Sequence, residues 1–200
     1  MSKFIYLISP NKIEKKFYND LTKVLKTNKV KFFQLRLKKK SKKNIIQIGK
    51  KIKLITKKYK VIFIINDFPD IVRKIGADGC HIGQSDRTIN YAKKISKDKI
   101  IGITCHNSKN LARYASKRKV SYVAFGSFFY SKLKPKAKKA NLKILKWAKI
   151  NIKKPVVAIG GITDKNYKKL LNAGAKYIAI SSFIWDNPEL KPEFAIKKFK

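Results

Sequence analysis

The sequence is poor in cysteine and lacks any long apolar run, and both absences exclude classes of protein. The two cysteines, Cys80 and Cys105, provide neither a disulfide framework nor a metal-ligand spacing, so we expect two reduced, buried thiols. No apolar stretch approaches the roughly 20 residues that span a membrane. The apolar segment near the N-terminus is too short for a signal peptide and is interrupted by Pro10. We therefore expect a cytoplasmic protein without a membrane partner.

Acidic residues are also scarce, with 11 Asp and Glu against 50 Lys and Arg and a formal net charge of +39. Only five of the basic residues are arginine, whereas surfaces that bind phosphates or bases usually use arginine as well. Lysine occurs throughout the chain beside many Ile and Asn residues, a composition typical of an A/T-rich genome. We therefore expect no specific nucleic-acid partner, although weak, salt-sensitive binding to polyanions follows from such a charge.

The chain alternates strand-like apolar runs with amphipathic segments and shows no linker or change of composition. Hydrophobic residues make up 44% of the 200 residues, which suits one domain with a real core. The expected strands cover residues 4–9, 30–38, 61–67, 79–84, 100–105, 122–127, 156–161 and 177–181. Eight β/α units in series predict a single (β/α)8 TIM barrel over residues 1–200, with an open doubly wound sheet as the alternative.

The first amphipathic segment carries a signal for where its helix begins. Ile13, Phe17 and Leu21 recur at helical spacing, and Asn11 followed by Glu14 resembles a capping box. This pattern predicts that the first helix begins near Asn11.

The second expected strand ends in polar side chains that share one face. Side chains alternate across a strand, so Gln34, Arg36 and Lys38 point to one side and Leu37 to the other. In this fold the active site lies at the carboxyl ends of the strands. We therefore expect the amide and the two cations at the mouth of the barrel, although Lys38 could equally be a surface charge.

Two aspartates follow the neighbouring strands. Asn66 and Asp67 end the third strand, and Asp86 follows the fourth. Mg2+ takes one or two carboxylates and completes its shell with phosphate oxygens and water, so the pair predicts a Mg2+ site shared with a polyphosphate. The alternative is that both aspartates cap helices.

The remaining strand ends supply groups suited to phosphate. Thr104 and His106 end the fifth strand, whereas His81 lies inside the fourth and is expected to be a satisfied core histidine. Glycines and serines end the seventh and eighth strands, where these barrels commonly bind a phosphate. The loop after the sixth strand is rich in lysine and could be a lid over an anion or a solvated surface.

Several motifs along nearly the whole chain resemble one family, thiamine-phosphate synthase. In order they are IYLIS, QLRLK, IINDFPDIV, ADGCHIGQSD, IIGITCH, YVAFGSFF, PVVAIGGI and AGAKYIAISS. The spacing of 19 residues between Asp67 in NDxxD and Asp86 in DGxHxGQxD is the specific element. The resemblance implies a barrel enzyme that joins hydroxymethylpyrimidine diphosphate to hydroxyethylthiazole phosphate, both small-molecule substrates, and releases pyrophosphate.

The resemblance also implies roles for individual residues. Gln34 would contact the pyrimidine, Asp67 and Asp86 would hold Mg2+, and Thr104 keeps the hydroxyl of the usual serine. The diphosphate would be held by Arg36, Lys38, Asn66 and Lys134, and the thiazole phosphate by Gly161, Ile180 and Ser181. Arg36, Lys38, Thr104 and Lys134 would carry the catalysis. In the loop after the sixth strand, Ser131 can replace the family's first threonine, but Leu133 lacks the hydroxyl of the second.

Three other functions remain open at this point. A thiazole tautomerase shares the barrel and the phosphate site but lacks the aspartate of GQxD, and it would use a histidine near His106. A basic barrel that binds nucleic acid would need arginines and stacking aromatics. The Leu133 departure leaves room for an inactive barrel. The sequence does not decide between a monomer and a homo-oligomer.

Overall fold

The computed structural model describes residues 3–83, 89–96, 98–118, 120–130 and 139–200. Within these ranges, eight parallel strands close into a barrel in which each strand pairs with its neighbours in sequence and β8 pairs with β1. The strands are β1 Ile5–Ile8, β2 Val30–Leu35, β3 Ile62–Asn66, β4 Gly79–Ile82, β5 Ile100–His106, β6 Tyr122–Gly126, β7 Val156–Ile159 and β8 Tyr177–Ile180. The closed barrel confirms the (β/α)8 prediction and rules out the open sheet.

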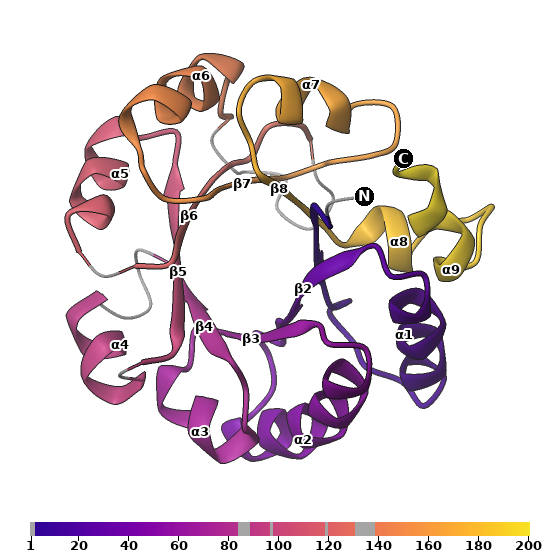
Figure 1. The fold of residues 1–200 in the computed structure, drawn as a ribbon. Coiled ribbons are helices and arrows are strands. Elements are labelled where there is room, and N and C mark those ends of the chain that lie inside the picture. Colours follow the sequence, from indigo (N-terminus) through magenta and orange to yellow (C-terminus); the bar gives the residue numbers. More distant parts are fainter. Residues whose placement is uncertain (1–2, 84–88, 97, 119, 131–138) are drawn as a thin grey trace.

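Helices surround the barrel (Figure 1). They are α1 Phe17–Lys26, α2 Lys42–Lys58, α3 Val72–Ile75, α4 Ile89–Ser96, α5 Lys109–Ser116, α6 Leu142–Asn151, α7 Tyr167–Asn172, α8 Ser182–Trp185 and α9 Pro192–Ala195, with 3-10 turns at Pro69–Ile71 (η1) and Ile196–Lys198 (η2). None of the helices in the described ranges is both long enough and apolar enough to cross a membrane.

The predicted start of the first helix is wrong. Helix α1 begins at Phe17, its N-cap is Lys16, and no side chain caps it. Glu14 instead pairs with Lys12 at 3.3 Å and offers its backbone carbonyl to the Phe17 N–H. A capping box requires the N-cap to sit one position before helical backbone, and residues 11–14 do not adopt that geometry.

Strand alternation divides the core of the described residues into two apolar clusters. The larger lies between the strands and the helices and includes Phe33, Leu35 and Leu37. The smaller fills the barrel interior with residues such as Tyr6, Phe32, Tyr122 and Tyr177. The burial of Leu37 in the outer cluster confirms that it points away from the barrel axis.

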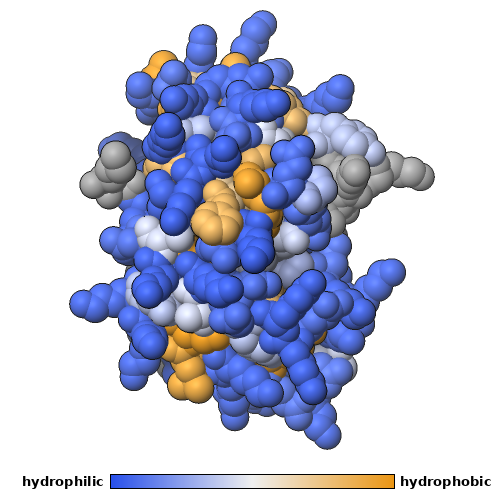
Figure 2. All heavy atoms as spheres, turned by 90° about the vertical axis from the view of Figure 1, so that its right-hand side faces the viewer, coloured by the Kyte–Doolittle hydropathy of each residue, from blue (hydrophilic) through white to orange (hydrophobic). Residues whose placement is uncertain are grey.

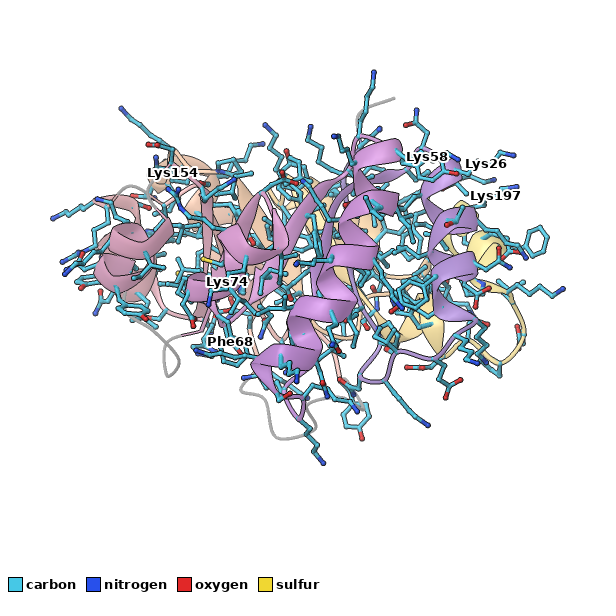
Figure 3. The ribbon with its side chains drawn as sticks, turned by 90° about the horizontal axis from the view of Figure 1, so that it is seen from below. Lys26, Lys58, Phe68, Lys74, Lys154 and Lys197 are labelled. Atoms are coloured by element: carbon cyan, nitrogen blue, oxygen red, sulfur yellow. The ribbon has the colours of Figure 1, made fainter. Side chains whose placement is uncertain are left out.

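The visible surface is largely hydrophilic (Figure 2), and lysines lie on several elements of the fold (Figure 3). Figure 2 shows a face that is largely hydrophilic and carries only scattered apolar side chains. In Figure 3, Lys26, Lys58, Lys154 and Lys197 lie toward one end of the barrel and Phe68 toward the other.

Candidate active site

A cavity of about 550 Å³ opens at the carboxyl ends of the strands. Nine of the twelve predicted site residues line it, and the other three, Asp86, Ser131 and Lys134, lie outside the described residues. The nine are Gln34, Arg36, Lys38, Asn66, Asp67, Thr104, Gly161, Ile180 and Ser181. The structure thus brings together, from β2, β3, β5, β7 and β8, side chains that are up to 147 positions apart in the sequence.

The cationic part of the cavity lies over β2 and β3. Arg36 follows β2, and its backbone N–H donates to the Oγ of Ser9 at 3.0 Å, which links the ends of β1 and β2. The ammonium of Lys38 lies 3.2 Å from a carboxylate oxygen of Asp67. Because half of Lys38 is exposed and Asp67 is mostly covered, this pair faces the mouth of the barrel rather than the apolar core.

The geometry of Asp67 bears on the metal prediction. Asp67 adopts a positive φ of 71° immediately after β3, and the helical turn that follows has Phe68 as its N-cap, without a side-chain cap. Asp67 is therefore not a helix cap. Its carboxylate and the amide of Asn66 are oxygen donors of the kind Mg2+ accepts. Among the described residues no group of three His, Cys, Asp or Glu side chains gathers as a complete ligand set, and the second predicted ligand, Asp86, lies outside the described residues.

The ends of β7 and β8 form the part of the cavity that suits a phosphate. Gly160 and Gly161 have φ values of +108° and +60°, which side chains rarely tolerate. A Cβ at Gly161 would lie 2.1 Å from the backbone oxygen of Tyr130. The hydroxyl of Ser181 donates to the carbonyl of Ser9 at 3.1 Å, which ties the end of β8 to β1.

Two histidines also line the cavity. His81 is buried, with 8% of its surface exposed, and both of its ring nitrogens are hydrogen-bonded, as expected of a satisfied core histidine. One of these partners is Thr104, so His81 also supports a predicted site residue. His106 is exposed at the end of β5 and has a positive φ of 51°.

Two buried tyrosines escaped the sequence analysis. The hydroxyls of Tyr6 and Tyr122 lie 2.6 Å apart inside the barrel, and the Gln34 amide donates to Tyr6 at 3.0 Å. Burial raises the pKa of both phenols well above the ordinary tyrosine value, so they stay protonated. Burial likewise raises the pKa of the Cys105 thiol to about 12, which leaves it unreactive in the folded protein.

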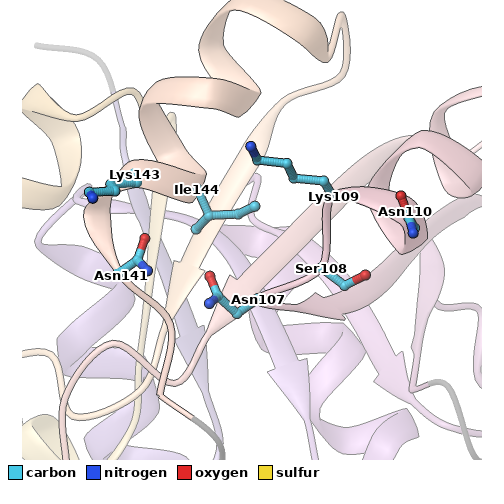
Figure 4. Close-up of a pocket in the computed structure, with 7 residues that line it drawn as sticks. All are labelled: Asn107, Ser108, Lys109, Asn110, Asn141, Lys143 and Ile144. Carbon is cyan, nitrogen blue, oxygen red and sulfur yellow. The ribbon is translucent and has the colours of Figure 1, made fainter.

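A second hollow of about 480 Å³ lies on the outside of the barrel, between the first turns of α5 and α6 (Figure 4). It is lined by Asn107, Ser108, Lys109, Asn110, Asn141, Lys143 and Ile144. None of the predicted site residues belongs to it, so the cavity at the mouth remains the candidate active site.

Comparison with known proteins assigns the family. The sequence model described as "Thiamine monophosphate synthase" matches residues 5–184. A thiamine-phosphate synthase from Pelagibacter ubique is 53% identical over 99% of this chain and 96% of its own, and one from Methanobrevibacter smithii is 37% identical over 98% and 95%. The solved structure of thiamine phosphate pyrophosphorylase from Pyrococcus furiosus superposes with a TM-score of 0.87 at 28% identity, covering 98% of this chain and 93% of that one. The chain belongs to the thiamine monophosphate synthase family.

Proposed function

We propose that this protein is a thiamine-phosphate synthase that acts in the cytoplasm. It transfers the pyrimidinylmethyl group of hydroxymethylpyrimidine diphosphate to the ring nitrogen of hydroxyethylthiazole phosphate. The bond between the methylene carbon and the diphosphate oxygen breaks, and a carbon–nitrogen bond forms. The products are thiamine phosphate and pyrophosphate.

The observation that carries this proposal is a single cavity with two separate regions suited to anions. Arg36 and Lys38 stand over β2, and the glycine backbone and Ser181 stand over β7 and β8. Two phosphorylated substrates need two such regions and a space between them in which the rings can meet. A cavity of about 550 Å³ is within the range of small-molecule sites.

The cations act on the charge that moves during the reaction. Negative charge grows on the diphosphate as it leaves, and Arg36 and Lys38 offset it, with Lys134 as the predicted third cation. The thiazole nitrogen is itself the nucleophile, so the protein contributes position rather than a covalent intermediate. Thr104 and Gln34 would orient the pyrimidine on the floor of the cavity.

Asp67 and Asp86 are the residues we propose to hold Mg2+. When bound with the diphosphate, Mg2+ would neutralise part of the charge on the leaving group. A carboxylate oxygen of Asp67 lies 3.2 Å from the ammonium of Lys38, which we propose to bind the diphosphate, so Mg2+ held by Asp67 would lie near the leaving group.

Measuring thiamine phosphate formation in matched variants tests the assignment. Wild-type protein with both substrates and Mg2+ should form the product, detected as thiochrome fluorescence after oxidation. Asp67→Asn and Arg36→Met should each lose at least about 100-fold in kcat, since each removes a charge from the leaving-group end. Asp20→Asn, on the outer helix α1, is the control and should keep full activity. Full activity in Asp67→Asn and Arg36→Met would overturn the proposed roles, and an inactive, folded wild type would overturn the function.

The product formed by the wild-type protein also distinguishes a synthase from a tautomerase. The relatives that cover nearly the whole chain are named as synthases, which favours the first. Isomerisation of the thiazole, dependent on His106, together with no thiamine phosphate, would instead identify the tautomerase.

A further inference from the structure

A chain of hydrogen bonds crosses the barrel interior and joins three residues that line the cavity, Gln34, His81 and Thr104. It starts at the Gln34 amide, whose nitrogen donates to the Tyr6 hydroxyl at 3.0 Å, and that hydroxyl lies 2.6 Å from the hydroxyl of Tyr122. The Tyr122 hydroxyl lies 3.0 Å from His81 Nδ1, and His81 Nε2 lies 2.8 Å from Thr104 Oγ1. Five different strands, β2, β1, β6, β4 and β5, thus contribute one member each.

The bond from Gln34 gives one direction for the whole chain, as long as the amide nitrogen faces Tyr6. The amide nitrogen of Gln34 can only donate, so in this orientation Tyr6 accepts from it and has its single proton left to give to Tyr122, 2.6 Å away. Tyr122 then gives its proton to Nδ1 of His81. A neutral imidazole that accepts at Nδ1 carries its proton on Nε2, so His81 donates to Thr104.

No single bond of the chain can reverse alone. Reversing one would set two protons, or two bare lone pairs, against each other inside a buried interior where such a clash is costly. Tyr6, Gln34 and His81 are 2%, 3% and 8% exposed, so little water reaches the chain. The chain therefore switches only as a unit. In the direction given above the Gln34 nitrogen faces Tyr6, as in the structure, and the reverse direction would require the flipped amide.

The packing around Tyr122 shows how the chain is accommodated. Gly102 on β5 pairs in register with His81 on one side and Tyr122 on the other. A Cβ at Gly102 would lie 1.9 Å from Cζ of Tyr122, so the missing side chain is what lets this ring reach across to His81. The two rings stack with centroids 5.7 Å apart and an interplanar angle of 19°.

We propose that Tyr6, Tyr122 and His81 are positioning residues that hold the Gln34 amide in one of its two flip states and so select an aminopyrimidine. With Nε2 tied to Tyr6, the amide presents its oxygen and its second N–H to the cavity in a fixed order. An aminopyrimidine edge carries an amino donor beside a ring-nitrogen acceptor, which a side-chain amide can bind through both atoms. The corresponding oxo-pyrimidine carries the reverse pattern and would need the flipped amide. The identity of this ring rests on the proposed function.

Nitrogen-15 NMR of the ligand-free protein tests the direction of the chain without any activity measurement. The sequence has only two histidines, so the His81 signals are assigned by comparison with His81→Asn. We expect wild-type His81 near neutral pH to be the Nε2–H tautomer, and Tyr122→Phe to shift it toward a mixture. Tyr177→Phe makes the same chemical change in the same interior cluster without touching the chain, and should leave the tautomer unchanged. An Nδ1–H tautomer in wild type, or an unchanged tautomer in Tyr122→Phe, would overturn the proposal.

Binding selectivity tests the consequence for the ligand. Titration calorimetry compares the diphosphates of the 4-amino and the 4-oxo pyrimidine, in the absence of thiazole phosphate. Wild type and Tyr177→Phe should prefer the amino compound, and the preference should fall about tenfold in Tyr122→Phe, where the amide is free to flip. Tyr6→Phe, which removes the acceptor itself, should give the same result and serves if Tyr122→Phe does not fold. An undiminished preference in these variants would overturn the proposal. Failure of the wild type to bind either compound would count against the proposed function, and the NMR result would still decide whether the chain runs as stated.

Discussion

Replacing Gly102 with alanine should destabilise the barrel through one identifiable contact. The new Cβ would lie 1.9 Å from Cζ and 2.2 Å from the hydroxyl oxygen of Tyr122. Such distances are impossible, so the ring of Tyr122 must move. Because this ring is buried and bonded at its hydroxyl to both Tyr6 and His81, any movement also breaks two hydrogen bonds.

The cost follows from these two effects. Overpacking a well-filled core costs about 1–3 kcal/mol, and two lost hydrogen bonds add about 1–3 kcal/mol in total. We therefore expect the free energy of unfolding in urea to fall by about 2–6 kcal/mol. In a Tyr122→Leu background the obstructing ring atoms are gone, and Gly102→Ala should be neutral or stabilising by about 0.5 kcal/mol, as alanine for glycine in a strand usually is. An equal loss of stability in both backgrounds would show that the contact with Tyr122 is not the cause.

Three further predictions concern other parts of the molecule. Gly161→Ala places a Cβ 2.1 Å from the backbone oxygen of Tyr130, at a φ of +60° that side chains rarely adopt. In steady-state kinetics, the KM for thiazole phosphate should rise at least about tenfold, and the KM for the pyrimidine diphosphate should change much less. Trp185→Phe removes the bond of 2.6 Å from the indole N–H to the carbonyl of Ile8, and urea unfolding should show a loss of about 1 kcal/mol or more. Burial raises the pKa of Cys105 from 9.0 to about 12, so the unfolded chain releases this proton first and stability should fall as pH rises from about 9 toward 12. Cys105→Ala should show a smaller loss of stability over that pH range, and an identical pH dependence would contradict the assignment.

The barrel could be predicted from the sequence because its signals are local. Each of the eight expected strands overlaps a strand of the structure, and the face of each strand follows from strict alternation. For example, Leu37 lies in the outer apolar cluster, whereas Gln34 lines the cavity. The predicted start of α1 was wrong because residues 11–14 have the residue types of a capping box, whereas the helix has Lys16 as its N-cap and no side chain caps it.

The hydrogen-bond chain could not have been predicted in the same way. Alternation places Tyr6, His81 and Tyr122 on the inner face of their strands, but it does not say which of them meet. The two tyrosines are 116 positions apart, and their contact depends on the register of strands on different sides of the barrel. Gly102 is the one local signal, because a glycine within an apolar strand often marks a close approach by another group.

Phosphorus-31 NMR can follow both products of one reaction and so test directly whether the protein is a thiamine-phosphate synthase. Purified protein is incubated with hydroxymethylpyrimidine diphosphate, hydroxyethylthiazole phosphate and Mg2+. We expect one thiamine phosphate and one pyrophosphate to appear together for each pair of substrates consumed. Pyrophosphate without thiamine phosphate, or no consumption of either substrate by the folded protein, would contradict it.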